Sequence, residues 1–201
     1  MKKLLFLTIW MFVGVVSAQD MRTVFMNAPE ELFPLLTKSH RADFIDYIDA
    51  GMTAKVTNRL DGVSVLEELS DDYLRLAATA SSTVQMKMLP FENDTIICVV
   101  NTVKAESADS RICFYDKEWQ RVDGREMFEY PSLEDFFISS ATEYIDVCDI
   151  YLVSLMLSSV DNTLVAEYTM PSYMNIEDAE KVRTLLRRLE YRWNGERFVI
   201  E

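Results

Sequence analysis

The strongest constraint on the fold lies between Tyr73 and Asp116, where apolar and polar residues alternate. A period of two is typical of strands, because successive side chains point to opposite faces of a sheet. A turn at residues 81–83 aligns the apolar faces of the first two strands. The predicted pairs are Ala80 with Val84, Ala78 with Met86 and Leu76 with Met88. Further strands over 95–103 and 112–115 complete an antiparallel meander.

Two more hairpins are expected near the C-terminus. Strands over 151–157 and 164–170 meet at Asp161-Asn162, where both residues tolerate left-handed conformations. Strands over 189–193 and 196–200 meet at Asn194-Gly195, which favours a type I′ turn. The predicted pairs are Leu157 with Ala166, Leu155 with Tyr168, Val153 with Met170, Tyr191 with Phe198, and Leu189 with Ile200.

Helical patterns separate these strands. The expected helices are residues 39–50, a short helix opening at Pro29, one opening after Ser132, and residues 176–188. The last is the best specified, because Asn175 caps it and Arg187 and Arg188 meet its negative end. The sequence therefore predicts an α+β fold, with an antiparallel meander and hairpins and three to four interleaved helices.

The first 18 residues have the features of a cleavable signal peptide. Lys2 and Lys3 precede an apolar run over 4–16, and small side chains lead to Ala18, after which we expect cleavage. An uncleaved anchor is the alternative, but it needs about 18 or more apolar residues. The residue directly after the cleavage point is Gln19 and not cysteine, so a bacterial lipid anchor is not expected. The predicted location is the periplasm or the exterior of the cell.

Residues 19–201 form either a single α+β domain or two joined lobes, at about 25–128 and 129–201. A chain of this length buries enough surface to fold without disulfides or metal. The whole sequence carries a formal charge of −13, and loss of Lys2 and Lys3 moves it to −15. Such a chain is repelled by phosphate backbones and anionic membrane surfaces, so nucleic-acid binding is not expected. No second long apolar run follows residue 18, so an integral membrane role is not expected either.

Three cysteines, Cys98, Cys113 and Cys148, remain after cleavage. Export permits disulfides, but an odd number leaves at least one thiol unpaired within the chain. Their spacing matches no zinc pattern. Small buried residues on strands, or one disulfide and one free thiol, are the two interpretations that remain open.

The search for catalytic residues gives a negative prediction. His40 is the only histidine, and its place at a helix start favours a capping or surface role over catalysis. The acidic groups considered as glycosidase pairs or calcium ligands are Asp43, Asp46 and Asp49; Asp71 and Asp72; and Asp146 and Asp149. Each is expected to be a solvated face or strand end, since 33 acidic residues produce close pairs by chance. We therefore predict no catalytic, cofactor-binding or metal-binding residue.

Exposed aromatic residues offer a different kind of site. Trp119 and Trp193 could stack on sugars or fill a pocket in a partner, although alternation places most aromatic side chains in the core.

Four segments together resemble a family of exported proteins of unknown function from Bacteroidetes-type gut bacteria. The segments are residues 36–46, residues 56–62, residues 109–116 followed by Trp119, and the closing Trp193-Asn194-Gly195 with Phe198. The resemblance spans nearly all of the mature chain and implies a location in the periplasm or at the cell surface. It brings no activity, cofactor or catalytic residue.

These observations favour a non-catalytic exported protein that binds an envelope protein or a small ligand through its surface or a sheet edge. The alternatives are a carboxylate-based hydrolase acting on glycans and a calcium-stabilised module.

Overall fold

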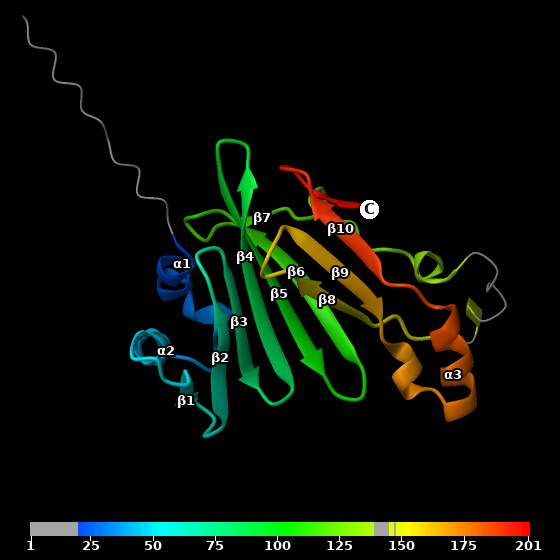
Figure 1. Cartoon of the computed structure of the whole chain (residues 1–201), viewed down its shortest axis with the longest axis horizontal. Helices are drawn as coiled ribbons and strands as arrows, with labels where there is room; N and C mark the ends of the chain where they lie inside the picture. Colours follow the sequence, from blue (N-terminus) through cyan, green and yellow to red (C-terminus); the bar gives the residue numbers. More distant parts are fainter. Residues whose placement is uncertain (1–19, 139–144, 147) are drawn as a thin grey trace, which may run out of the picture.

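The computed structural model describes residues 20–138, 145–146 and 148–201 (Figure 1). The expected signal peptide lies outside these residues. Within them, none of the helices is long and apolar enough to span a bilayer. The division into one domain or two lobes stays a prediction.

The larger sheet is a seven-stranded meander in which every strand pairs with its neighbour in sequence. Its strands are β1 (Lys55–Thr57), β2 (Val63–Leu69), β3 (Tyr73–Thr79), β4 (Ser82–Phe91), β5 (Asp94–Lys104), β6 (Ala108–Tyr115) and β7 (Arg121–Val122). Residues 96–100 of β5 are buried on both faces. This burial explains their continuous apolar run, because a central strand covered on both sides has no polar face.

The smaller sheet has four strands in the order β11-β10-β9-β8. They are β8 (Val153–Leu157), β9 (Thr163–Tyr168), β10 (Leu189–Trp193) and β11 (Phe198–Ile200). The open edge of this sheet is β11, which is only three residues long.

The described helices are α1 (Met21–Asn27), α2 (Lys38–Asp49) and α3 (Ile176–Leu185), with 3-10 turns at Glu30–Leu32, Glu134–Phe136 and Met170–Tyr173. Asp20 caps α1, since its carboxylate accepts the Thr23 N–H at 2.9 Å. The buried Arg41 guanidinium donates to the carbonyls of Phe25 and Ala28, at 3.0 and 2.6 Å, and so satisfies groups at the end of α1.

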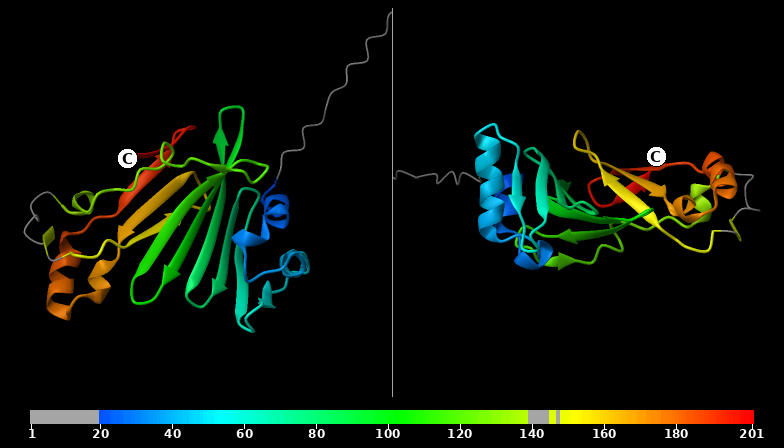
Figure 2. Two further views of the ribbon diagram at one scale, coloured as in Figure 1. Left: turned by 180° about the vertical axis from the view of Figure 1, so that it is seen from behind. Right: turned by 90° about the horizontal axis from the view of Figure 1, so that it is seen from below.

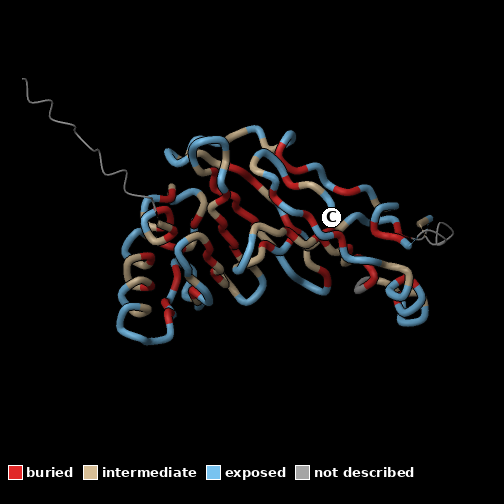
Figure 3. The backbone as a smooth tube through the Cα atoms, turned by 45° about the horizontal axis from the view of Figure 1, so that its top comes forward, coloured by how far each residue is buried: buried red, intermediate tan, exposed pale blue. Residues whose placement is uncertain are grey.

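The structure has three layers (Figure 2). The apolar residues of α1 and α2 pack on one face of the meander, against Leu74, Leu76 and Met86 among others. The opposite face, which includes Tyr73 and Phe114, packs against the smaller sheet. Buried backbone accordingly runs along the strands of both sheets (Figure 3).

Polar side chains join the two sheets where β8 lies across the meander. Gln85 Oε1 accepts the N–H of Leu157 at 3.3 Å, and Ser110 Oγ accepts the N–H of Leu155 at 2.9 Å. Asp109 accepts the N–H of Val153 at 3.4 Å. These acceptors pair the N–H groups on the free edge of β8, so burial of that edge leaves them satisfied.

All three predicted hairpins form, but their predicted registers are wrong. In β3–β4, Leu76 pairs with Val84 instead of Met88, and a bulge separates Ala77 from Thr79. In β8–β9, Leu157 pairs with Leu164 instead of Ala166. Each register differs from the predicted one by an even number of residues, so the same side chains share a face.

The last hairpin also corrects the predicted turn. Trp193 pairs with Phe198, and Tyr191 pairs with Ile200 instead of Phe198. A four-residue loop replaces the type I′ turn, because Asn194 Oδ1 accepts the N–H groups of both Glu196 and Arg197, each at 2.9 Å. Asparagine commonly uses its side chain in this way to form a turn.

The helix predictions need three corrections. The last helix ends at Leu185 and not at Arg188, because Leu186 forms a bridge with Phe137. The helices expected at Pro29 and after Ser132 are single 3-10 turns, and α1 was not predicted. The fold is broadly α+β as expected, but it is dominated by its sheets: α1 and α2 precede the strands, and only α3 is interleaved among them.

Candidate binding groove

A groove of about 1300 Å³ runs along the open edge of the smaller sheet. One wall is formed by β11 and the loop before it, residues 194–200, and the other by the segment after β7, residues 122–135. Phe91, the last residue of β4, and Glu92, in the β4–β5 turn, also line it. A smaller hollow of about 500 Å³ shares Val122, Asp123, Arg125 and Tyr130 with the groove and reaches Cys113.

A tight turn at Gly124 directs the chain toward β11. The Gly124 carbonyl accepts the N–H groups of Met127 and Phe128, at 3.0 and 2.9 Å. A Cβ atom at Gly124 would lie 2.7 Å from the ring of the buried Phe114, so this position favours glycine. The Met127 carbonyl then accepts the N–H of Phe198 at 2.8 Å, which fixes the segment beside β11.

Tyr130, Tyr191 and Phe198 line the base of the groove, and the buried Phe128 packs beneath them. Phe128 makes edge-to-face contacts with Tyr130 and Tyr191, at centroid distances of 5.1 and 5.2 Å, and with Phe198 at 6.2 Å. Such contacts stabilise an aromatic cluster beyond the burial of its area. Met127, Phe128, Tyr191 and Phe198 are buried, whereas Tyr130 is 41% exposed. The base is therefore a packed apolar surface that is formed before any ligand binds.

The hydroxyl groups of the tyrosines differ in their partners. Tyr130 Oη accepts the Ile112 N–H at 3.1 Å and donates to the Ser110 carbonyl at 3.3 Å. Tyr191 is only 7% exposed, lines the groove, and has no hydrogen-bond partner for its hydroxyl among the described residues. Burial, with the nearby carboxylates of Asp135 and Glu129, raises the pKa of Tyr191 to about 12. Its hydroxyl therefore stays protonated and can donate to a ligand.

Carboxylates dominate the rim of the groove. The lining contains six of them, from Glu92, Asp123, Glu126, Glu129, Asp135 and Glu196, against two guanidinium groups, from Arg125 and Arg197. Arg125 pairs with Asp123 at 2.6 Å and lowers the pKa of that carboxyl to about 2. The other five carboxylates form no ion pair with any described residue. The groove is thus an acidic surface over an aromatic base.

The backbone of β11 also faces this groove. The Glu201 N–H donates to the Glu190 carbonyl at 2.9 Å, toward β10, whereas the Phe198 N–H points away from β10, to Met127. Backbone groups alternate in direction along an antiparallel strand. The N–H and C=O of Ile200 therefore point away from β10, and no described residue pairs with them.

The sequence-predicted residues do not gather in this groove. His40 lies in a capping box at the start of α2, where its N–H donates to Thr37 Oγ1 at 3.1 Å and its Nδ1 accepts the Thr37 N–H at 3.3 Å. The expected capping role of His40 is confirmed.

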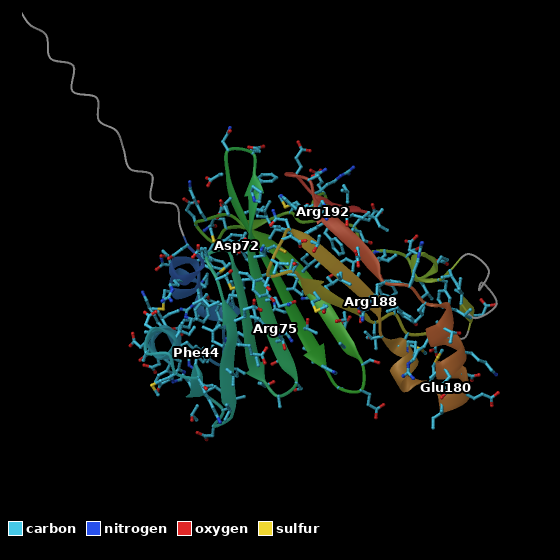
Figure 4. The ribbon with its side chains drawn as sticks, in the orientation of Figure 1. Phe44, Asp72, Arg75, Glu180, Arg188 and Arg192 are labelled. Atoms are coloured by element: carbon cyan, nitrogen blue, oxygen red, sulfur yellow. The ribbon has the colours of Figure 1, made fainter. Side chains whose placement is uncertain are left out.

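The acidic groups singled out in the sequence are dispersed. Asp49 pairs with Arg22 at 2.7 Å, and Asp72 pairs with the buried Lys87 at 2.9 Å. Asp72 lies immediately before β3, on the far side of the molecule from α3 (Figure 4). Among residues 20–138, 145–146 and 148–201, no three His, Cys, Asp or Glu side chains form a group that could hold a metal ion.

The cysteines and tryptophans are mainly structural. Cys98, Cys113 and Cys148 are all free and buried in the structure. Burial raises the pKa of the Cys98 thiol well above its ordinary value. Trp193, considered above as an exposed stacking residue, is instead 6% exposed, and its Nε1 donates to the Pro90 carbonyl at 2.6 Å.

Sequence reasoning missed the groove residues for an identifiable reason. Tyr191 and Ile200 were assigned correctly to strands, but Glu126 and Glu129 lie in a segment with no motif. Contacts between segments about 70 positions apart bring these residues together: the hydrogen bond between Met127 and Phe198, and the ring contacts of Phe128 with Tyr191 and Phe198. The surplus of Glu and Asp over 123–135 was the one visible signal.

The fold defines a sheet-dominated α+β protein, in which a helical layer and a second sheet cover the two faces of a meander. The chain belongs to the family described as "Protein of unknown function (DUF3256)", whose model matches residues 13–198. A solved domain of an uncharacterized protein from Porphyromonas gingivalis W83 is 27% identical and similar in structure, with a TM-score of 0.80. The similarity covers 92% of this chain and 99% of that chain. No curated protein matches the sequence. Membership of a family of unknown function, expected from the sequence, is confirmed.

Proposed function

We propose that this protein is an exported, non-catalytic binding module of the cell envelope, and that it binds a partner through the groove beside β11. The observation that carries the proposal is the combination of a preformed aromatic base, the hydroxyl of Tyr191, which has no described partner, and rim carboxylates without ion pairs. Binding sites commonly combine an apolar surface with a few polar groups that orient the ligand.

The carboxylates favour binding over acid catalysis. A glycosidase needs one carboxylic acid whose pKa is raised, so that it is protonated when it acts. Asp123, on the groove rim, has its pKa lowered instead, and Asp20, Asp94 and Asp161 elsewhere are also lowered. Each of these carboxylates accepts hydrogen bonds that stabilise its charged form.

The sequence supports export. A positively charged start, a short apolar run and small residues before Gln19 are the features that a signal peptidase recognises. The acidic character of the chain favours a protein or small-ligand partner over nucleic acid.

Site-specific photo-crosslinking tests this function. A photoreactive amino acid replaces Ile200, at the groove, or Asp46, on the exposed face of α2, in the full-length chain expressed in a Bacteroidetes host. We expect the mature protein in the periplasmic or extracellular fraction, with a discrete adduct from position 200 and none from position 46. Equal labelling at both positions, no adduct, or a chain retained in the cytoplasm contradicts the proposal.

A further inference from the structure

We infer that the occupant of this groove is an extended polypeptide segment rich in lysine or arginine, which lies alongside β11. This inference rests on the proposed binding function and specifies the class of ligand. Three observations carry it: the surplus of unpaired carboxylates, the open backbone of Ile200, and the aromatic base that contains Tyr191.

The charge of the rim selects a cationic partner. Glu126, Glu129, Glu92 and Glu196 are exposed and form no ion pair with a described residue, and the nearby Arg125 is already paired with Asp123. Like charges held close together repel one another, and a cationic ligand relieves that repulsion. The same rim repels phosphorylated, sulfated or acidic ligands.

The edge of β11 selects an extended chain. Ile200 lines the groove, is 56% exposed, and turns its N–H and C=O away from β10. An added strand pairs with such groups through two backbone hydrogen bonds, the arrangement used in β-strand addition. The segment at Met127 already makes one bond of this kind to Phe198, so an incoming chain would continue an edge that the protein itself begins to cover.

The base of the groove suits the side chains of such a peptide. Lysine and arginine carry long apolar stems, which pack on the exposed ring of Tyr130, itself supported by Phe128, while their charged ends reach the rim. Aromatic faces also attract cations directly. The protonated Tyr191 hydroxyl, held at the base without a described partner, can donate to a backbone carbonyl of the ligand. A neutral glycan would use the tyrosines but would use neither the charge of the rim nor the backbone of Ile200.

Fluorescence anisotropy with defined probes tests the inference. The labelled probes are a decapeptide alternating Lys with Thr, the same peptide with Glu for Lys, and two forms of the Lys peptide, N-methylated at the odd or at the even backbone positions. Unlabelled neutral oligosaccharides compete against the Lys peptide and are also titrated by calorimetry. We expect the Lys peptide to bind and the Glu peptide not to bind. One of the two N-methylated peptides should bind more weakly, because alternate backbone groups face the edge of β11, and added salt should reduce the affinity of the Lys peptide.

A matched pair of variants locates the binding. The double variant Glu126→Gln with Glu129→Gln removes two charges from the rim, whereas Asp46→Asn with Glu180→Gln removes two exposed charges from α2 and α3. Glu180 lies on α3, far from Arg192, which belongs to the last hairpin (Figure 4). We expect the rim variant to lower affinity at least about threefold, and the control variant to stay within about twofold.

The outcomes separate the inference from the function on which it rests. Equal losses in both double variants would show attraction to net charge alone and overturn the inference. Binding of oligosaccharide without binding of the Lys peptide would also overturn it, while leaving a binding role intact. If no probe binds but position 200 still gives a discrete crosslink, only the ligand class is wrong. If that crosslink is also absent, the proposed function fails as well.

Discussion

Gln85, buried on β4, accepts the N–H of Leu157 on β8 at 3.3 Å and donates through Nε2 to Tyr73 Oη at 2.8 Å. One side chain thereby links two strands of the meander to the smaller sheet. Its amide satisfies a backbone donor and a phenol that burial removes from water.

Gln85→Ala should therefore destabilise the fold by about 1–3 kcal/mol, because it leaves the Leu157 N–H without its acceptor in the core. Gln120→Ala is the matched control, since Gln120 is exposed and its side chain forms no hydrogen bond with a described residue of the smaller sheet. Guanidinium denaturation of both variants measures the effect. Equal midpoints would show that the link between the sheets contributes nothing.

Two tyrosines of the groove should differ in their contribution to stability. Tyr130→Phe removes a hydroxyl with two hydrogen-bond partners and should cost about 1 kcal/mol. Tyr191→Phe removes a hydroxyl with no partner among the described residues, and stability should change by less than about 0.5 kcal/mol. Thermal unfolding of the two variants checks the order, and the reverse order would place a structural partner on Tyr191.

Particular residues show how far sequence reasoning reaches. Alternation over β3 and β4 identifies which side chains share a face, but it does not fix register, because pairing Leu76 with Val84 or with Met88 buries the same face. The helix cap at Asn175 was predictable from local chemistry, and its side chain does accept the Asp178 N–H at 3.0 Å. The end of α3 was not, because the bridge from Leu186 to Phe137 joins distant segments. The groove depends on such a distant contact too.

Gly195→Val should destabilise the protein by on the order of 1 kcal/mol or more, even though the turn differs from the one expected. Gly195 has φ of +104°, a conformation that a β-branched residue adopts only with strain. Glu196→Val, at the next exposed position, serves as the control. Denaturation midpoints decide the point, and an unchanged midpoint for Gly195→Val would argue against this backbone conformation.

The three thiols should remain free and react unequally. Cys98 is fully buried and its pKa is raised by burial, so iodoacetamide should modify it only after unfolding. Cys113 is 9% exposed, lies at the smaller hollow, and accepts a contact from Arg121 Nη2 at 3.7 Å, so it should react earlier. Mass spectrometry of the labelled peptides gives the order. A mass two units lower for the unreduced protein would indicate a disulfide.

Stability should fall at alkaline pH. Burial, followed by nearby ionisable groups, raises the pKa of Tyr151 and of Tyr191 from 10.0 to about 12. The pKa of each tyrosine is higher in the folded state than in the unfolded state, so the unfolded tyrosines ionise first. The stability that these two tyrosines contribute is therefore complete below pH 10 and is lost between about pH 10 and 12. Guanidinium midpoints at pH 9 and 11 test the trend. The double variant Tyr151→Phe with Tyr191→Phe should lose less stability over this interval than the unmodified chain.

The side-chain acceptors along β8 also determine how the protein opens. The amide protons of Val153, Leu155 and Leu157 are held by Asp109, Ser110 and Gln85, three residues of the meander, and not by a neighbouring strand. Fraying of the β8–β9 hairpin alone does not release these protons; separation of the two layers does. Their exchange with deuterated solvent would therefore report the opening of the interlayer contact, independently of the loosening of either sheet.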